Sequence, residues 1–397
     1  MLRFFFLFIS SSHSWWIPSE QVINMINLYE NRTNLNHNKP VAYPFHSGYS
    51  LRHYCEPSVS DFGTKCKMKP ENIKNGSCVF VVGDCLPEFI HSIAPNIVGR
   101  YMVISTDSDV SVPDGQDDAL AIRLQIFNTS SFFADEYRKG KLISFHASNT
   151  WWKNHLHVPR PTYLHCMPYG VNGEVSTYIN AYRRNMIYFS QYGLAAKANQ
   201  TLLLISFTQD KFKPDRKKIF HMLKRIPGHE RWTNYTKRAM TTNDQFLDAV
   251  FQHKFVLVPH GRGLDSFRLA EVLLMGGIPV IRNSSIASCY DDSDNDVEVE
   301  MRETGKIASG QSKGILDSAI RTNVGQKKRL SRGSIPIVIL NRWEDLTEER
   351  LNSEWRRITS FPRDSWDWSR VFMPHWLERM GFSPFWWFWW LQIKKRM

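Results

Sequence analysis

The stretch that decides the fold spans residues 253–282 and reads HKFVLVPHGRGLDSFRLAEVLLMGGIPVIR. Within it, residues 255–258 form a short apolar run with two valines, which predicts a buried parallel strand. The next segment, residues 260–265, holds two glycines and an arginine and therefore predicts a loop. Either Asp265 or Ser266 is suited to cap the helix that follows, because a short polar side chain can accept a hydrogen bond from a free backbone N–H group.

The end of this stretch completes the pattern. Gly276 and Gly277 end the helix, and residues 278–281 predict another buried strand. Strand, loop, helix and strand make a βαβ unit whose glycine-rich loop follows the carboxyl end of its first strand. Ligands of open α/β sheets bind at that end. The free N–H groups and the positive dipole end of the helix favour an anion, usually a phosphate.

Three charged side chains accompany the loop. Arg262 and Arg268 would add positive charge and forked donors for a phosphate. Glu271 lies three residues after Arg268, so both can face one ligand, and a carboxylate suits sugar hydroxyls. The alternative is a structural βαβ unit with a solvated arginine–glutamate pair, because a lone glycine-rich loop is weak support for a ligand.

This stretch also resembles a known family. The nucleotide-sugar site of exostosin-type glycosyltransferases (glycosyltransferase family 47) has Gly, Ser, Arg and Glu in the same register. The matching positions are Leu257-Val-Pro-x-Gly261-Arg262-x-Leu264-x-Ser266-Phe267-Arg268-x-x-Glu271-x-Leu273, followed by Gly-Ile-Pro-Val. The resemblance is strongest over residues 244–282. It is weaker but ordered over 79–210 and 335–358.

The resemblance implies an α/β fold of two facing Rossmann-like domains, the GT-B type of glycosyltransferase fold. It implies an inverting transfer from a nucleotide sugar, a UDP-sugar, to a glycan or glycoprotein acceptor, usually without an essential metal. The donor-binding positions it implies are Gly261, Arg262, Gly263, Ser266, Arg268 and Glu271. The two arginines would balance the departing diphosphate, the serine and the glycine backbones would contact phosphate, and the glutamate would hold the ribose or the sugar. The sequence departs from the family at His260 and in a long insertion.

Length and composition agree with a globular protein of two domains. The chain has 397 residues, of which 42% are hydrophobic and 22% charged, and its formal net charge is +12. A basic surface favours anionic partners such as a nucleotide diphosphate, an acidic glycan or a membrane surface. No zinc finger or RNA-binding signature is visible, so nucleic acid is not an expected partner.

Cysteines and glycosylation sequons favour the secretory route. Six cysteines occur, at Cys55, Cys66, Cys78, Cys85, Cys166 and Cys289. Their spacing makes no zinc pattern, and the even number permits disulfides whose pairing the sequence does not fix. Asn-x-Ser/Thr sequons occur at Asn31, Asn75, Asn128, Asn199, Asn234 and Asn283.

The two ends suggest membrane association. Arg3 followed by the apolar residues 4–9 resembles a signal peptide or a shortened signal anchor. At the other end, the Trp/Phe-rich residues 385–393 precede Lys394-Lys395-Arg396-Met397, which suits a membrane interface or, equally, an aromatic tail packed on the protein. We therefore expect a luminal, membrane-anchored protein of the Golgi or endoplasmic reticulum.

The order of elements predicts the domains. The expected parts are a signal or anchor with a stem (1–50), an acceptor domain (51–195), a nucleotide-sugar domain (196–380) and a tail (381–397). Predicted strands cover 79–82, 101–104, 142–145, 163–167, 201–207 and 335–340. Predicted helices cover 214–225, 244–252, 343–357 and 366–380, and another lies within 174–200. The polar residues 291–334 predict a disordered insertion, or translated intron sequence.

Loops of the first domain hold the candidates for the catalytic base. An inverting transfer needs a group that takes the proton of the acceptor hydroxyl. Asp107 and Asp109 follow a hydrophobic strand and lead this set, ahead of Asp84 and His146. As an Asp-x-Asp pair, the first two could instead hold Mn²⁺ or Mg²⁺ over a diphosphate, or form a solvated turn. We expect no required metal.

Other side chains have weaker assignments. Trp151 and Trp152 would stack a sugar ring or belong to the core. Arg216 and Lys217 would meet a phosphate or form a solvated basic face. Two other functional classes stay open: a metal-dependent transferase built on Asp107 and Asp109, and a non-catalytic glycan-binding relative. The donor sugar, hexose or pentose, is not fixed by the sequence.

Overall fold

The computed structural model describes residues 51–52, 55, 58–59, 66, 69–106, 108, 110–114, 129–151, 160–172, 175–192, 201–207, 214–236, 243–261, 263–290, 335–361, 366–371 and 373–381. The predicted stem, the insertion at 291–334 and the tail beyond 381 lie outside these residues, so those assignments stay predictions.

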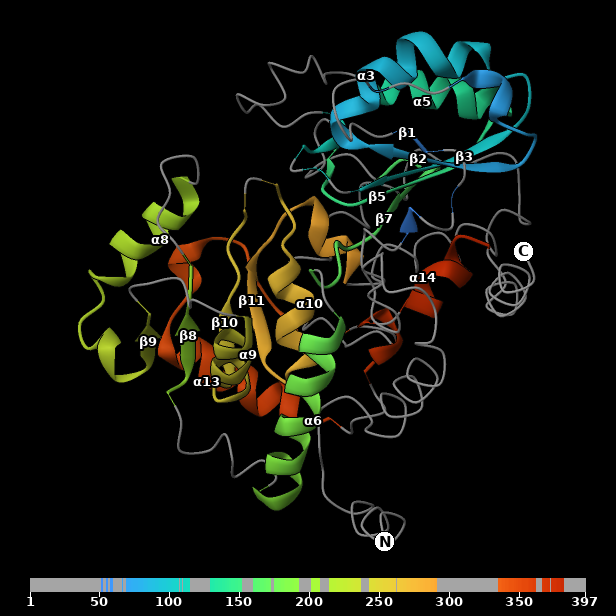
Figure 1. Ribbon diagram of the computed structural model, residues 1–397. Coiled ribbons are helices and arrows are strands. Elements are labelled where there is room, and N and C mark those ends of the chain that lie inside the picture. The colour runs from blue at the N-terminus through green and yellow to red at the C-terminus, as the bar shows by residue number, and fades with distance from the viewer. Residues whose placement is uncertain are drawn as a thin grey trace, which may run out of the picture.

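The first domain is built on a parallel sheet with the strand order β1-β2-β3-β5-β7. The strands are β1 (Ser58–Val59), β2 (Ser77–Val82), β3 (Tyr101–Thr106), β5 (Leu142–Ala147) and β7 (Leu164–Cys166). From β2 to β7 each strand is added on the same side of the last, so right-handed crossovers place the connecting helices on one face. That face carries α3 (Leu86–Glu88), the π-helical turn η4 (Phe89–Ile93) and α5 (Thr129–Arg138), seen above the sheet in Figure 1.

The second domain is built on another parallel sheet, with the order β12-β11-β10-β8-β9. Its strands are β8 (Leu203–Ile205), β9 (Thr233–Tyr235), β10 (Phe255–Leu257), β11 (Ile278–Arg282) and β12 (Val338–Leu340). Its helices are α8 (Pro214–Leu223), α9 (Asn243–Phe251), α10 (Phe267–Leu274) and α13 (Glu348–Thr359). Buried valines, leucines and isoleucines fill the strands, as expected for a sheet covered on both faces.

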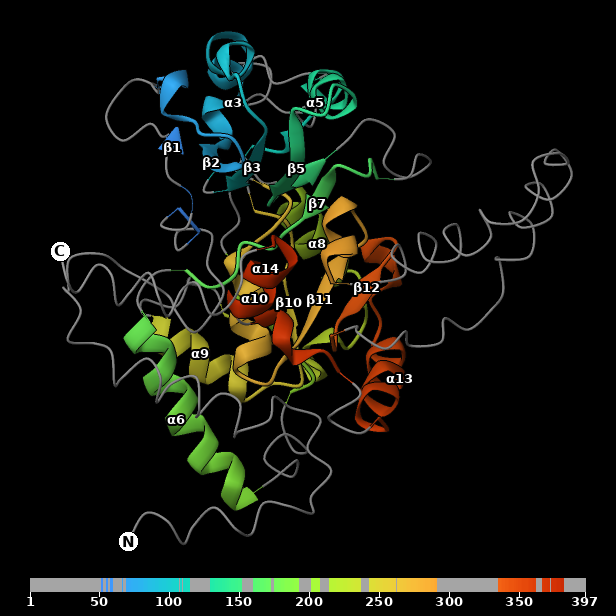
Figure 2. The ribbon, with the colours of Figure 1, turned by 90° about the vertical axis from the view of Figure 1, so that its right-hand side faces the viewer.

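Two helices connect the domains. Helix α6 (Val175–Tyr192) follows the first sheet, yet Tyr178 and Tyr182 pack into the core of the second. Helix α14 (Met373–Arg379) comes from the end of the chain and packs against the first sheet, where Trp376 and Leu377 join a cluster with Phe80. It covers the face that the crossovers leave open, and it lies between the two domains in Figure 2. Each domain therefore takes part of its core from the other half of the sequence.

The remaining described elements are short. They are a two-stranded sheet of β4 (Val112–Pro113) and β6 (Thr150–Trp151) and the single turns η2 (Pro70–Asn72), η3 (Gly83–Cys85), η5 (Ala94–Asn96), η6 (His229–Arg231), η7 (Ser285–Cys289), η8 (Trp343–Asp345) and η10 (Trp368–Val371). None of the helices among the described residues combines the length and apolarity that crossing a membrane requires.

All six cysteines form disulfides. Cys55 pairs with Cys78, and Cys66 pairs with Cys85, so two bonds staple the edge of the first sheet. Cys166 at the end of β7 pairs with Cys289 in η7, and this third bond joins the two domains. The even cysteine count had permitted disulfides; the pairing comes from the structure.

The sheets confirm the predicted fold class of two facing Rossmann-like α/β domains, and the predicted strands and helices that lie in the described regions are present. Two predicted helices need correction. The helix expected over 343–357 is divided into η8 and α13, since Thr347 caps a new helix that begins at Glu348. The helix expected over 366–380 is divided into η10 and α14. The buried Arg370, whose Nη1 donates to the carbonyl of Cys289 at 3.0 Å, belongs to the first of these pieces.

Candidate functional site

The glycine-rich loop lies at the topological switch point of the second sheet. Strand β8 has β9 on one side, and the chain then returns to add β10 on the other side. In doubly wound sheets ligands bind outside the carboxyl ends of the two strands where the order reverses. The loop after β10 therefore lies where this fold binds ligands.

The loop is held against the first domain. Gly263 has no room for a side chain, because a Cβ atom there would lie 2.3 Å from Nδ2 of Asn149. At Gly261 a Cβ atom would have ordinary space, with its nearest neighbour at 3.8 Å. The two predicted glycines thus differ: the first domain requires one, and packing leaves the other unconstrained.

Of the two predicted helix caps, Ser266 is the one observed. Its backbone is extended, with φ −149° and ψ 135°, and its side chain accepts a hydrogen bond from the backbone N–H of Arg268 at 3.4 Å. The hydroxyl is thus engaged at the N-terminus of α10, where the dipole favours an anion.

Asp265 instead joins the domains. Its Oδ2 accepts from the backbone N–H of Tyr169 at 2.7 Å, and its Oδ1 accepts from the N–H of Ser266 at 2.7 Å. Burial raises the pKa of Asp265 to about 6, although these bonds and one from the Tyr290 hydroxyl favour the ionised form. This buried anchor between loop and first domain was not predicted beyond a capping role.

Arg268 and Glu271 are brought together by one turn of α10, and both are largely withdrawn from solvent. The Arg268 guanidinium lies over the ring of Phe246 on α9, 4.8 Å from its centroid. Its Nη1 is buried and has no hydrogen-bond partner among the residues that the structure describes. Oε1 of Glu271 accepts from the Tyr178 hydroxyl at 2.8 Å. The alternative of a solvated arginine–glutamate pair is therefore not observed, since neither side chain is freely hydrated.

Burial shifts the titration of both groups. It raises the pKa of Glu271, opposed by the Tyr178 hydrogen bond and by the charge of Arg268. It lowers the pKa of Arg268, opposed by the charge of Glu271. A half-buried guanidinium with a buried, unused donor beside a buried carboxylate costs free energy that a purely structural helix pair would avoid. The pair is suited to bind a ligand with an anionic group and hydroxyls.

A second cluster of charged side chains lies at the carboxyl edge of the same sheet, and of its members only Arg216 was a ligand-binding candidate from the sequence. Nε of Arg216 donates to the carbonyl of His260 at 3.1 Å, and the Arg216 side chain is buried rather than part of the solvated basic face considered above. Asp215 pairs with Arg282 at 3.0 Å. Burial and the charge of Arg282 lower the pKa of His260 to about 4, so this imidazole is neutral near pH 7. Lys217 is exposed.

Two of the first-domain candidates, Asp84 and His146, lie among the described residues and have different surroundings. Asp84 follows β2, and its Oδ1 accepts a short hydrogen bond from the hydroxyl of Ser108, the residue between the two predicted catalytic aspartates. His146 is buried, with Nε2 3.0 Å from the Ser144 hydroxyl and its ring stacked on His165. Burial and the neighbouring charges of His165 and Arg379 hold the pKa of His146 well below its usual value.

Several predicted site residues have no described position. They are Asp107, Asp109, Trp152 and Arg262. Trp151 lies in β6 and is partly buried. Among the described residues, no group of three or more His, Cys, Asp or Glu side chains could hold a metal ion. Because both aspartates of the Asp-x-Asp pair are outside that set, their roles stay predictions.

Comparison with known proteins gives a distant likeness in fold. The sequence matches no protein-family model, and it matches no curated protein. An alpha,alpha-trehalose-phosphate synthase (UDP-forming) from Burkholderia vietnamiensis is 12% identical with a TM-score of 0.30, over 56% of this chain and 62% of that one. An alpha,alpha-trehalose 6-phosphate synthase from Burkholderia multivorans is 10% identical with a TM-score of 0.31, over 59% and 66%. The chain thus spans less than two thirds of either structure, and likeness at this level assigns no activity to it.

Proposed function

We propose that this protein is an inverting glycosyltransferase that moves a sugar from a UDP-sugar to a glycan or glycoprotein acceptor. The observation that carries the proposal is the arrangement at the switch point of the second sheet. A glycine-rich loop, a capped helix N-terminus and the half-satisfied pair of Arg268 and Glu271 meet there. The resemblance of residues 244–282 to exostosin-type glycosyltransferases supports the same choice.

The donor would be divided among these groups according to charge. Loop and helix N–H groups together with Arg268 suit the diphosphate, which gains charge as the sugar departs. Arg262 is proposed for the same task. The buried Glu271 suits ribose or sugar hydroxyls, because ionised carboxylates accept strong hydrogen bonds.

The acceptor and the catalytic base are assigned to the first domain. Asp107 and Asp109 are proposed as candidates for the base that takes the acceptor proton. Their loop follows β3, and it is tied to Asp84 through Ser108. Asn149 also contacts this loop, at the carbonyl of Ser108, and reaches the donor loop at Asp265. These contacts support a reaction site between the carboxyl edges of the two sheets.

The secretory assignment rests on the cysteines and sequons. Disulfides persist in oxidising compartments, and all six cysteines are paired. A membrane anchor in the Golgi or endoplasmic reticulum is proposed from the ends of the sequence.

Donor binding and turnover test the proposal together. UDP should raise the melting temperature of the purified protein, because a ligand that binds only the native state stabilises it. A screen of common UDP-sugars should find one that releases UDP in the presence of acceptor. Arg268→Ala should abolish both effects with the fold retained, whereas Lys217→Ala, on an exposed position of α8, should leave both unchanged. Absence of UDP protection in the unaltered protein would contradict the proposal.

The alternatives give different results in the same assay. A metal-dependent transferase built on Asp107 and Asp109 would lose turnover in EDTA and recover it with Mn²⁺. A non-catalytic glycan-binding relative would bind glycan without releasing UDP from any donor. EDTA-insensitive turnover would exclude both.

A further inference from the structure

Asn149 has an unusual backbone conformation at the junction of the domains. It lies between β5 and β6, is fully buried, and has a φ of 52°, the only positive φ of a non-glycine residue in the described part of the chain. Asparagine tolerates this left-handed region better than most residues, but such a conformation persists only where the surroundings enforce it. The contacts of the side chain identify what enforces it.

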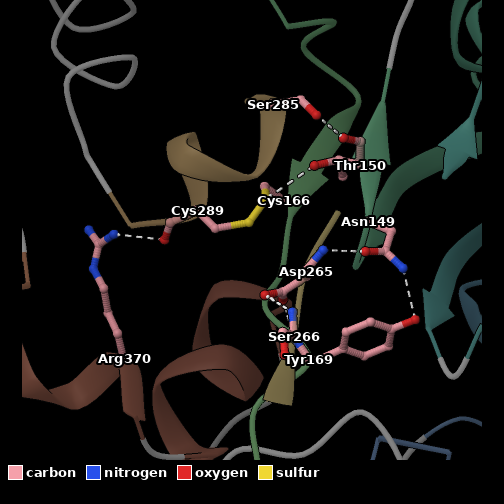
Figure 3. The surroundings of a disulfide bond; sticks show 9 residues. All are labelled: Asn149, Thr150, Cys166, Tyr169, Asp265, Ser266, Ser285, Cys289 and Arg370. Atoms are coloured by element: carbon pink, nitrogen blue, oxygen red, sulfur yellow. Dashed lines mark hydrogen bonds between the residues drawn. A yellow bond between two sulfur atoms is a disulfide. The ribbon is translucent and has the colours of Figure 1, made fainter. Parts of the chain in front are cut away.

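The Asn149 amide uses all of its donors and bridges the two domains. Its Nδ2 donates to the carbonyl of Ser108 and to the hydroxyl of Tyr169, each at 2.8 Å. Its Oδ1 accepts from the backbone N–H of Asp265 at 2.6 Å (Figure 3). The opposite amide orientation would set Nδ2 against that N–H and Oδ1 against the Ser108 carbonyl, so the contacts fix one orientation.

The same amide fills the space beside Gly263. A Cβ atom at this glycine would meet Nδ2 of Asn149 at 2.3 Å and Cγ at 2.7 Å. The φ of Gly263 is not in the left-handed region. Close approach by Asn149, rather than backbone conformation, therefore explains why the loop needs glycine there.

Neighbouring contacts brace this bridge. Tyr169, which receives one Asn149 hydrogen bond, donates its own N–H to Asp265. Next to Asn149, the carbonyl of Thr150 accepts from the Ser285 hydroxyl, and the Cys166–Cys289 disulfide lies close by (Figure 3). Contacts of its neighbours with the second domain therefore fix the position of Asn149 relative to the loop.

We propose that Asn149 is a positioning residue of the first domain that holds the glycine-rich loop in the shape that binds the donor diphosphate. This role rests on the proposed function. It makes the diphosphate site a joint product of both domains, and it requires no contact between Asn149 and the donor. The loop N–H groups would bind, and Asn149 would fix where they point.

Asn149→Gly is the most direct test, because glycine accepts the positive φ and the substitution removes the whole side chain, including the amide. We expect the dissociation constant of UDP, measured by calorimetry on the full chain, to rise by about tenfold or more, as for loss of a buried hydrogen bond. The dissociation constant of uridine, which lacks the diphosphate, should stay the same. Hydrogen exchange of the Asp265 amide should accelerate. Asn96→Ala, which removes an exposed first-domain amide bonded to the Ser92 carbonyl, should change none of these.

Two further variants guard against misfolding of the first. Asn149→Asp keeps the side-chain shape and the acceptor for the Asp265 N–H, but it places an acceptor against the Ser108 carbonyl. It should therefore also weaken the binding of UDP and leave the binding of uridine unchanged. Gly263→Ala should weaken UDP through its clash with Asn149. In the double variant with Asn149→Gly that clash is gone, so the two effects should not add.

The outcomes separate this inference from the proposed function. Unchanged UDP affinity in Asn149→Gly and Asn149→Asp, or equal weakening of UDP and uridine, would overturn the positioning role. Failure of the unaltered protein to bind UDP would overturn the proposed function. Exchange at the Asp265 amide then still decides whether Asn149 holds the loop, and unchanged exchange in the variants would refute that.

Discussion

Each domain buries a glutamate against a tyrosine, and the two pairs are satisfied differently. In the first domain, Glu136 accepts from the Tyr101 hydroxyl at 3.2 Å and from Nζ of Lys139 at 3.3 Å. The Lys139 side chain is 64% exposed, so its charge stays hydrated while it neutralises the carboxylate. Each oxygen of this buried carboxylate therefore has a hydrogen-bond donor within the domain.

In the second domain, the Glu271 carboxylate has fewer hydrogen-bond donors. The Tyr178 hydroxyl that reaches it also lies within hydrogen-bond distance of the Asn172 carbonyl, and one hydroxyl carries only one proton. Arg268 is close enough to favour the ionised form, but no ion pair within 4.0 Å joins the two among the described contacts. The nearby Asp265 is a second buried carboxylate with a raised pKa.

The difference supports the proposal that the second pair belongs to the donor site. Structural pairs tend to be fully satisfied, whereas buried groups with shifted pKa values and unused capacity gather at ligand sites. A donor sugar would supply hydroxyls to Glu271 and phosphate to Arg268. Equivalent substitutions in the two domains test this difference between the pairs.

The largest expected effect concerns the pH dependence of stability at Asp265. Its folded pKa of about 6 lies above the usual unfolded value, so the native state binds an extra proton between about pH 4 and 6. That stabilisation is fully present below pH 4 and is lost as the pH rises through 6. Over this range the free energy of unfolding should fall by about 3 kcal/mol through this group alone.

Asp265→Asn should remove this contribution to the pH dependence of the free energy of unfolding. Urea unfolding of the variant and the unaltered protein at a series of pH values measures it, and the difference between the two curves isolates the residue. Glu136→Gln is the first-domain control. Parallel curves for Asp265→Asn and the unaltered protein would show that Asp265 does not titrate as described.

The next effect concerns turnover. Glu271→Gln keeps an acceptor for Tyr178 but loses the charge, so UDP-sugar turnover should fall roughly tenfold to hundredfold, as for loss of a charge-assisted hydrogen bond worth about 1.5–3 kcal/mol. Stability near pH 7 should not fall, because the variant no longer buries a carboxylate whose pKa is raised. Glu136→Gln should show full turnover. Equal losses in both variants would abolish the distinction between the two pairs.

The sequence predicted the fold because the fold depends on local patterns, and the proposed site rests on the same patterns. Apolar runs marked the strands, and Gly276 with Gly277 marked the end of α10. The register of Arg268 and Glu271 placed both on one helix turn. What it could not predict is which partners these groups meet across the chain, since Tyr178 lies 93 residues from Glu271 and Asn149 lies 116 from Asp265.

Arg216 shows the same limit in another form. Its neighbours in α8 are charged, so the sequence pattern favoured a solvated face. In the structure its guanidinium instead donates to the carbonyl of His260, which lies 44 residues further along the chain. Asn149 carried one usable signal: an asparagine just after a buried strand can adopt a left-handed conformation. That signal is too common in loops to identify a residue on its own, and only the position of Gly263 gave it meaning.

The smallest expected effect is on stability when each tyrosine loses its hydroxyl. Tyr101→Phe should lower the free energy of unfolding by about 1 kcal/mol, because Lys139 still serves Glu136. Tyr178→Phe should cost about 2 kcal/mol, because Glu271 then keeps only the charge of Arg268, and its pKa should rise further. Urea unfolding near pH 7 measures both losses relative to the unaltered protein. Saturating UDP stabilises every variant that binds it, so the test is whether these losses change when all three proteins are compared with UDP present. The loss in Tyr178→Phe should shrink, since hydroxyls of the ligand would replace the missing one, whereas the loss in Tyr101→Phe should stay the same. Unchanged losses in both variants would mean that UDP stabilises the fold without engaging Glu271.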